Sequence, residues 1–133
     1  MDLKWLLFSF EGRVNRLPYW GVVLVMIALG SGLNFAIGDF GPGRPMTAGP
    51  AIIETVVFLL FVWIGLAMQI KRWHDRDKSG WWALLSVVPV IGTLWILIEC
   101  GLLPGTPGPN RFGPDPLGGP GRRPDEPPDL RAA

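Results

Sequence analysis

Residues 70–82, Ile70-Lys71-Arg72-Trp73-His74-Asp75-Arg76-Asp77-Lys78-Ser79-Gly80-Trp81-Trp82, decide the fold. Charge is dense within this stretch, and long apolar runs flank it on both sides. Ionised side chains are costly in hydrocarbon, whereas the flanking runs gain by leaving water. The pattern therefore predicts a tight, solvated loop at a membrane surface, between two membrane-spanning helices.

The composition of the 133-residue chain favours one small membrane unit. Hydrophobic residues make up 49% of it, and they are gathered in runs rather than spread along the chain. A net charge of +1 gives no field that would steer nucleic acid. A single cysteine excludes an intramolecular disulfide, and a single histidine excludes a multi-histidine metal site. We therefore predict no metal, no cofactor and no nucleic-acid partner.

Three apolar runs, at residues 19–38, 51–70 and 81–103, predict an all-α integral membrane bundle of three transmembrane helices. The first run has no charged residue and, at about 1.5 Å per residue, reaches roughly the 30 Å of a hydrocarbon core. Small residues recur in it at every fourth position. They either let another helix approach closely or merely reflect the abundance of Gly and Ala. They are Ala28, Gly32 and Ala36.

The second and third runs each contain a feature with two interpretations. Glu54, the only charge in the second run, either caps the start of the helix or has a function within the membrane. Pro89 and Gly92 fall near the middle of the third run. This run either crosses once as a tilted, kinked helix or turns back as a re-entrant segment whose halves are too short to cross. The predicted bundle takes the single crossing.

The remaining segments are predicted to lie outside the hydrocarbon core. Residues 3–10 form a short interfacial segment or a packed N-terminal turn. Residues 39–50 are rich in Pro and Gly and predict a loop, and residues 104–133 have a similar Pro/Gly-rich composition. We expect one membrane domain over residues 1–116 and a disordered tail over residues 117–133.

Basic residues are distributed unevenly about the three predicted crossings. The first loop and the near part of the tail carry only Arg44 and Arg111. The N-terminal segment and the central stretch carry Lys4, Arg13, Arg16, Lys71, Arg72, Arg76 and Lys78. Because cytoplasmic loops are enriched in Lys and Arg, we expect a multi-pass protein with its N-terminus and central stretch in the cytoplasm. A re-entrant third run would bring the tail to the cytoplasm too.

Motifs in three parts of the chain, in the right order, resemble a known family. Residues 10–20 resemble its F-x-GR-x-x-R-x-x-(F/Y)W opening, and residues 71–82 are similar to its (K/R)R-x-HD-x-x-x-SGWW centre. Pro89-x-x-Gly92 and residues 105–116 resemble its third segment and closing motif. Trp73 and Pro109 depart from its usual residues. The family is domain of unknown function 805, the YhaH-like proteins; the resemblance implies a small bacterial inner-membrane protein and no established activity.

These features favour a non-enzymatic membrane protein, which acts as a scaffold, a regulator or a subunit of an assembly, either with itself or with another membrane protein. Catalysis by His74 and Asp75 is disfavoured, because adjacent residues on a helix do not face each other. The sequence has no nucleophile elbow, phosphate loop or metal-ligand spacing. Asp75 is instead expected to pair with an arginine, and Ser79 to cap the third helix.

The candidate site is a polar and aromatic cluster at the membrane surface, with no catalytic, cofactor or metal-binding residue assigned. It either recognises anionic lipid headgroups or another anionic ligand, or it only fixes the orientation and depth of the protein in the bilayer. Its members come from the opening, central and closing motifs: Arg13, Arg16, Lys71, Arg72, His74, Asp75, Arg76, Ser79, Trp81, Trp82, Asn110 and Arg111.

Overall fold

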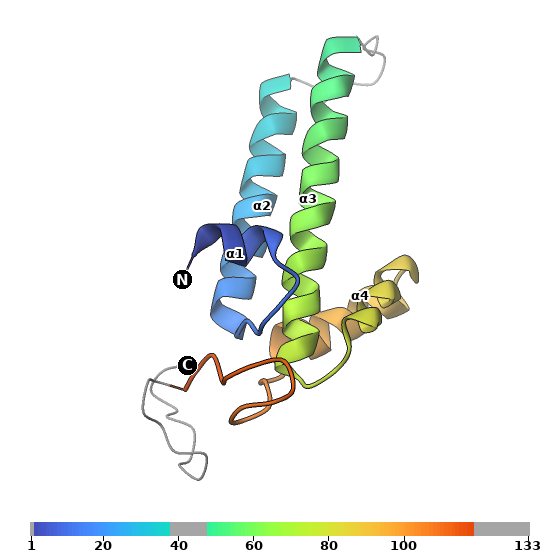
Figure 1. Ribbon diagram of the computed structural model, residues 1–133. Helices are drawn as coiled ribbons and strands as arrows, with labels where there is room; N and C mark the ends of the chain where they lie inside the picture. The colour runs from blue at the N-terminus through green and yellow to red at the C-terminus, as the bar shows by residue number, and fades with distance from the viewer. Residues whose placement is uncertain (1, 38–47, 119–133) are drawn as a thin grey trace.

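The structure, a computed structural model, describes residues 2–37 and 48–118, and these residues form an all-helical fold (Figure 1). The described part contains one isolated bridge, between Asn110 and Gly113, and no strand. Its elements in chain order are α1 (Leu3–Phe8), α2 (Arg16–Ile37), α3 (Ala48–Asp75), the 3₁₀-helix η1 (Gly80–Val87), α4 (Ile91–Ile96) and the π-helix η2 (Leu97–Leu102).

Two long helices, α2 and α3, lie side by side and run in opposite directions (Figure 1). By length and composition both can cross a membrane, over Arg16–Ala36 and Ala51–Asp75. No residue of the apolar window in the first span is fully buried within the chain; Val22 and Met26 are partly buried against the core, and many of the other apolar side chains are exposed. The structure thus supports the first two predicted spans, with longer helices than the runs 19–38 and 51–70 indicated.

The predicted loop at residues 70–82 begins later than expected, because α3 continues through Asp75. In the turn that follows, Asp77 adopts a left-handed backbone with φ of 55°. The amide of Lys78 then donates to the carbonyl of Trp73 at 2.8 Å, a bond that closes a helix C-terminus. Ser79 caps η1 as predicted, since its side chain accepts from the amide of Trp81.

The third apolar run does not form one long helix, so the structure does not confirm the single crossing predicted for residues 81–103. The chain turns back between η1 and α4, which pack against each other. Val90 has φ of 62° next to Pro89, and Gly92 lies so close to the carbonyl of Leu85 that any side chain there would collide with it. A continuous helix cannot accommodate this turn. We call residues 80–102 the re-entrant hairpin.

Both ends of the re-entrant hairpin return to the C-terminal end of α3. Trp82, near its start, lies 5.8 Å from Trp73 between ring centroids. Cys100, near its end, accepts a hydrogen bond from Arg72 through its carbonyl at 2.7 Å. This path agrees with the re-entrant alternative, and its placement relative to the bilayer stays a prediction. Residues 104–118 continue from the hairpin along the same end of α3, where they contact the N-terminal segment.

The N-terminal segment packs against α3 rather than standing apart from it. Trp5 and Leu6 of α1 pack on a small core formed by Val14, Ile64 and Met68. This is the packed-turn alternative, although Leu3 and Phe8 remain exposed. The last three residues of the predicted loop at 39–50 belong to α3, which begins at Ala48. Residues 39–47 of that loop and residues 119–133 of the predicted tail lie outside the described residues.

The small residues at every fourth position of α2 do not contact α3. Ala28, Gly32 and Ala36 are exposed, and a Cβ built on Gly32 meets nothing within 4 Å. The opposite side of α2 faces α3, where Gly30 lies against Phe61. Close helix packing through this row of small residues stays a prediction that only another chain can satisfy.

Candidate functional site

The predicted polar cluster forms a buried network where three segments meet at the C-terminal end of α3 (Figure 1). These segments are the stretch between α1 and α2, the end of η2, and the closing residues 104–118. We call the network the polar knot and define it by its charged members, Arg13, Lys71, Arg72, Asp75, Arg76, Lys78 and Glu99.

Asp75 is the centre of the polar knot. Its two carboxylate oxygens pair with different arginines: Oδ1 lies 3.1 Å from Arg13 and Oδ2 lies 2.5 Å from Arg72. The side chains of the three residues are between 0% and 4% exposed. Because a buried charge is stable only when it is paired and hydrogen-bonded, each member of this trio requires the others. The expected pairing of Asp75 with an arginine is confirmed, with two arginines rather than one.

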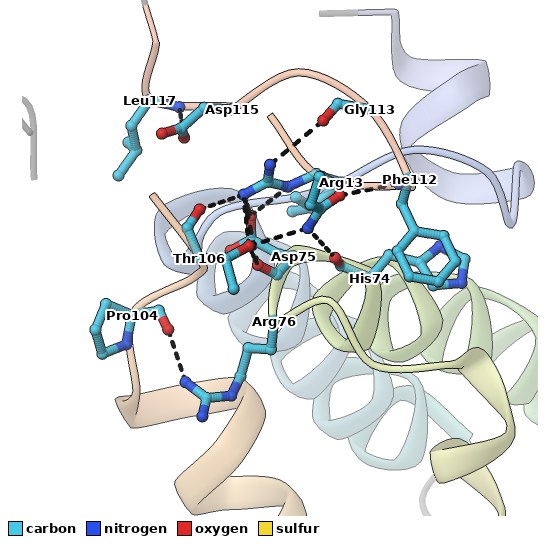
Figure 2. A network of polar contacts seen from close by, with 12 residues as sticks. Arg13, His74, Asp75, Arg76, Pro104, Thr106, Phe112, Gly113, Asp115 and Leu117 are labelled. Atoms are coloured by element: carbon cyan, nitrogen blue, oxygen red, sulfur yellow. Dashed lines mark hydrogen bonds and ion pairs between the residues drawn. The ribbon is translucent and has the colours of Figure 1, made fainter. Parts of the chain in front are cut away.

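Arg13 joins the opening motif to residues 104–118, which we call the closing segment (Figure 2). Its guanidinium donates to the carbonyls of Thr106 and Gly108, both at 2.6 Å. Thr106 in turn donates its amide to the carbonyl of Asp75 at 2.8 Å. Gly105 lies directly against the Asp75 carboxylate, where a Cβ would collide with the carboxylate oxygens. A glycine at this place thus lets the closing segment approach the buried charge.

Arg72 satisfies carbonyl groups that the end of the re-entrant hairpin leaves without helical partners. Its Nε donates to Cys100 at 2.7 Å, and its terminal nitrogens donate to Leu103 at 2.9 Å and Val14 at 3.1 Å. The last carbonyls of a helix lack partners within it and carry partial negative charge. The arginine therefore fastens the hairpin to α3 by chemistry that an apolar side chain cannot supply.

Two other basic side chains donate hydrogen bonds to carbonyls at neighbouring helix ends. Lys71 is fully buried, and its ammonium donates to the carbonyls of Trp5 and Leu6 at the end of α1. The same ammonium lies 4.7 Å from the centre of the Trp5 ring, a cation–π contact. Arg16 donates to Leu102 of η2 at 3.0 Å. Lys71 and Arg16 are thus engaged with helix carbonyls of the chain itself.

Glu99 forms the second charged centre of the polar knot. It pairs with Arg76 at 2.6 Å and with Lys78 at 2.9 Å. The Lys78 ammonium also lies over the rings of Trp73 and Trp82. Arg76 donates as well to the carbonyl of Pro104 at 2.7 Å, which ties α3 to the start of the closing segment (Figure 2).

His74 has a structural environment and does not use its neighbour Asp75. Its ring stacks on Phe112 with centroids 3.9 Å apart and planes at 6° (Figure 2). Its Nδ1 lies 3.2 Å from the carbonyl of Gly12, and its own carbonyl accepts from Asn110 at 2.8 Å. Each polar group of His74 named here contacts backbone or amide groups, so no histidine–aspartate relay is assembled.

The structure brings most predicted site residues together but buries the central ones. Lys71, Arg72 and Asp75 are at most 3% exposed, so the prediction of a solvated loop is wrong for them. They are buried because the opening and closing motifs fold over them and supply carbonyl partners. Trp81 and Arg111 remain at the surface, Trp81 78% exposed and Arg111 in an exposed ion pair with Asp77.

Sequence reasoning missed the contacts of Gly105 and Thr106. For Glu99, an isolated charge at the end of an apolar run, the sequence indicates a basic partner, and the structure provides two, Arg76 and Lys78. Gly105 and Thr106 stood within the closing motif without an assigned contact. Among residues 2–37 and 48–118, no group of three or more His, Cys, Asp or Glu is placed to hold a metal ion.

Comparison with known proteins finds the same motifs elsewhere. Residues 7–114 match a family model described as "Protein of unknown function (DUF805)". The chain is 42% identical to the inner membrane protein YhaH of Escherichia coli K12 over 110 residues, which cover 81% of this chain and 87% of YhaH. It is 37% identical to the inner membrane protein YhaI of the same organism over 108 residues, which cover 81% and 86%. No solved structure matches the chain with significance.

Proposed function

Because the chain belongs to the DUF805 family of unknown function, whose relatives YhaH and YhaI are named inner membrane proteins, we propose that it is a non-enzymatic assembly-partner protein of the bacterial inner membrane. It crosses the membrane twice, through α2 and α3, and presents their outward apolar faces to another membrane protein or to a second copy. The polar knot holds the two helices and the re-entrant hairpin in a fixed arrangement at one membrane surface.

One observation carries this proposal: the buried charged side chains of the polar knot are already bonded within the chain. Arg13 and Arg72 donate to backbone carbonyls and to Asp75, and Lys71 donates to the end of α1. Such groups stabilise a structure and are not available to a substrate. The outward face of α2, by contrast, has no partner among the described residues.

The side that faces the cytoplasm follows from the same arrangement. The polar knot, the N-terminal segment and residues 104–118 contact one another, and with two crossings they lie on one side of the membrane. Residues 38–47, which connect α2 to α3 in the sequence, carry one basic residue. Cytoplasmic segments are enriched in Lys and Arg, so we place the knot in the cytoplasm. The basic residues on that side are Lys4, Arg13, Arg16, Lys71, Arg72, Arg76, Lys78 and Arg111.

Co-purification tests the assembly proposal. Tagged protein is extracted from native membranes in a mild detergent and in lipid nanodiscs, and its mass and companions are measured. We expect a stoichiometric membrane protein or a second copy, released by Gly32→Leu on the outward face of α2. Gly65→Leu, on another helix surface with open space around it, is the matched control and should retain the companion. A wild-type protein that is alone and monomeric in both media contradicts the proposal.

The second candidate function is recognition of anionic lipid headgroups. It is favoured by the excess of cations over carboxylates in the polar knot and by the exposed ring of Trp81 nearby. Arg16 and Arg111 are its accessible cations, since Arg13 and Arg72 are buried. Binding to phosphatidylglycerol vesicles should fall in the double variant Arg16→Gln, Arg111→Gln while the protein stays folded. Unchanged binding rejects this candidate.

A further inference from the structure

A groove of about 820 Å³ opens between α2, α3 and the re-entrant hairpin. Its long walls are apolar and include Val22, Met26 and Phe61, and its floor contains Ser86 and Ile96 of the hairpin. The groove exists because the hairpin turns back: beyond the turn no third helix of the described chain accompanies α2 and α3. It lies within both candidate membrane spans, so its natural surroundings are lipid and not water.

Hydrogen-bond donors gather at the end of the groove beside the polar knot. Gln69 lines this end and is 8% exposed; its Oε1 lies 3.0 Å from the hydroxyl of Ser86, whose single proton is shared with the carbonyl of Ala83 at 2.5 Å. Its amide nitrogen has no hydrogen-bond partner in residues 2–37 and 48–118. Tyr19 lines the same end, packs against the core around Trp73, and its hydroxyl likewise has no partner in the described part. An unpaired donor at membrane depth is costly, so these groups require an acceptor.

The polarity of the groove changes along its length. From Tyr19 to Asn34 the helix α2 rises about 22 Å, more than the roughly 15 Å of one hydrocarbon leaflet. Beyond Gln69 the walls are apolar over the depth of that leaflet, and Gly30 and Gly65 keep them hollow. Asn34, near the far end, already donates to the carbonyl of Gly30 at 2.8 Å. Gln69 and Tyr19 thus place an amide and a phenol donor at the interfacial end, while the other polar groups of the lining away from that end include the hydroxyls of Ser31 and Thr93.

We propose that this groove binds a glycerophospholipid from the leaflet on the side of the polar knot. Its ester carbonyl oxygens accept from the Gln69 amide and the Tyr19 hydroxyl, and one acyl chain lies along Val22, Met26 and Phe61. Phospholipid esters offer acceptors and no donors, which complements the groove. The backbone groups of a transmembrane helix are satisfied within the helix and offer no such acceptors. The proposal goes beyond the assembly function and uses a different surface of α2.

Photo-crosslinking of the full chain in vesicles tests the proposal. The probe is phosphatidylethanolamine with a diazirine on one acyl chain, and the crosslinked residues are mapped by mass spectrometry. We expect crosslinks concentrated on Val22, Met26 and Phe61. Crosslinks spread evenly around the outward faces of α2 and α3 overturn the proposal, as do protein–protein crosslinks between two copies at these residues.

Variants separate the groove from the rest of the lipid-facing surface. Gly65→Leu fills open space in the groove and should reduce crosslinking to background, whereas Gly32→Leu, on the opposite side of α2, should leave it unchanged. Gln69→Leu should reduce it about fivefold, the effect of one hydrogen bond. Ser86→Ala removes the Ser86–Gln69 bond but keeps the amide donor, and should retain crosslinking. Persistence of the crosslinks in Gly65→Leu overturns the proposal.

A second probe tests the polar half of the proposal. A diazirine-bearing alkane of the same chain length has no acceptor and should label the groove more weakly than the phospholipid, with no response to Gln69→Leu. Equal labelling by both probes overturns the pairing of Gln69 with an ester. Detergent unfolding midpoints of all variants show whether each is folded. Because this readout does not depend on a protein partner, its failure is distinct from failure of the assembly proposal.

Discussion

At the scale of single residues, the polar knot shows how a membrane protein can bury charge at low cost. Asp75 neutralises part of the charge of Arg13 and Arg72, and backbone carbonyls accept their remaining donors. Removing one partner of a buried ion pair typically costs about 3–5 kcal/mol, because the other charge stays buried. An exposed pair of the same chemistry contributes about 0–1 kcal/mol.

Asp75→Asn should therefore destabilise the protein by about 3–5 kcal/mol, since two buried guanidinium groups lose their counter-ion. The control is Asp77→Asn, which affects only the exposed pair with Arg111 and should cost less than about 1 kcal/mol. Unfolding of the purified protein in detergent micelles measures both. Equal effects of the two substitutions would show that the knot is not a unit of stability.

Gly105→Ala tests the close approach of the closing segment to the same carboxylate. The added Cβ would collide with Asp75, so we expect a loss of about 1–3 kcal/mol in unfolding free energy. Gly32→Ala, where nothing lies within 4 Å, is the control and should be neutral or slightly stabilising. The prediction is wrong if both variants unfold at the wild-type midpoint.

The residue types of the site were predictable, but their burial was not. The density of charge at residues 71–78 indicated a functional or anchoring cluster, and the pairing of Asp75 with arginine followed from its neighbours. The burial of Lys71 depends on carbonyls at the end of α1, and that of Arg13 on carbonyls of Thr106 and Gly108. The sequence does not show where backbone carbonyls will lie in the fold, so it predicts that a charged cluster is solvated.

At the scale of elements, length and hydropathy were sufficient for α2 and α3 but not for the third run. A proline in an apolar segment is compatible with a kink or with a full turn. The turn is stabilised by the contact of Gly92 with Leu85 and by Arg72, which donates hydrogen bonds to carbonyls at the end of η2. Both are tertiary contacts, which the composition of residues 81–103 does not reveal.

Cysteine labelling checks the re-entrant hairpin directly. In a Cys100→Ala background, cysteines replace Asp77, before the hairpin, and Pro107, after it; both positions are exposed. A membrane-impermeant thiol reagent should label both from the same side, and a cysteine at position 44 from the opposite side. Labelling of positions 77 and 107 from opposite sides would show that residues 81–103 cross the membrane once.

At the scale of the whole molecule, residues 104–118 are bonded to the rest of the described fold. Arg13 contacts carbonyls of Thr106, Gly108 and Gly113, so the opening motif is completed only by residues near the other end of the chain. The sequence predicted a domain that ends near residue 116, on the strength of the closing motif. It did not predict that this motif supplies the partners of the buried arginine.

Two truncations test this dependence. A chain that ends after Leu103 removes the carbonyls of Thr106, Gly108 and Gly113 that accept from Arg13. It should be degraded or aggregate, because the Arg13–Asp75 pair loses these acceptors and the segment that covers it. A chain that ends after Gly118 keeps every described contact and should accumulate at the wild-type level. Immunoblots of the membrane fraction measure both; normal accumulation of the shorter chain would contradict the closing role of residues 104–118.

The reach of Arg13 across the chain also bears on biosynthesis. Its partner Gly113 is made about 40 residues after Asp75, which takes a ribosome roughly 2–8 s at about 5–20 residues per second. During that interval Arg13 and Arg72 have been synthesised, but most of their hydrogen-bond acceptors have not. The nascent chain therefore passes through a period in which α2 and α3 have been synthesised but the contacts of Arg13 with residues 106–113 have not formed, and in which it is most open to proteases.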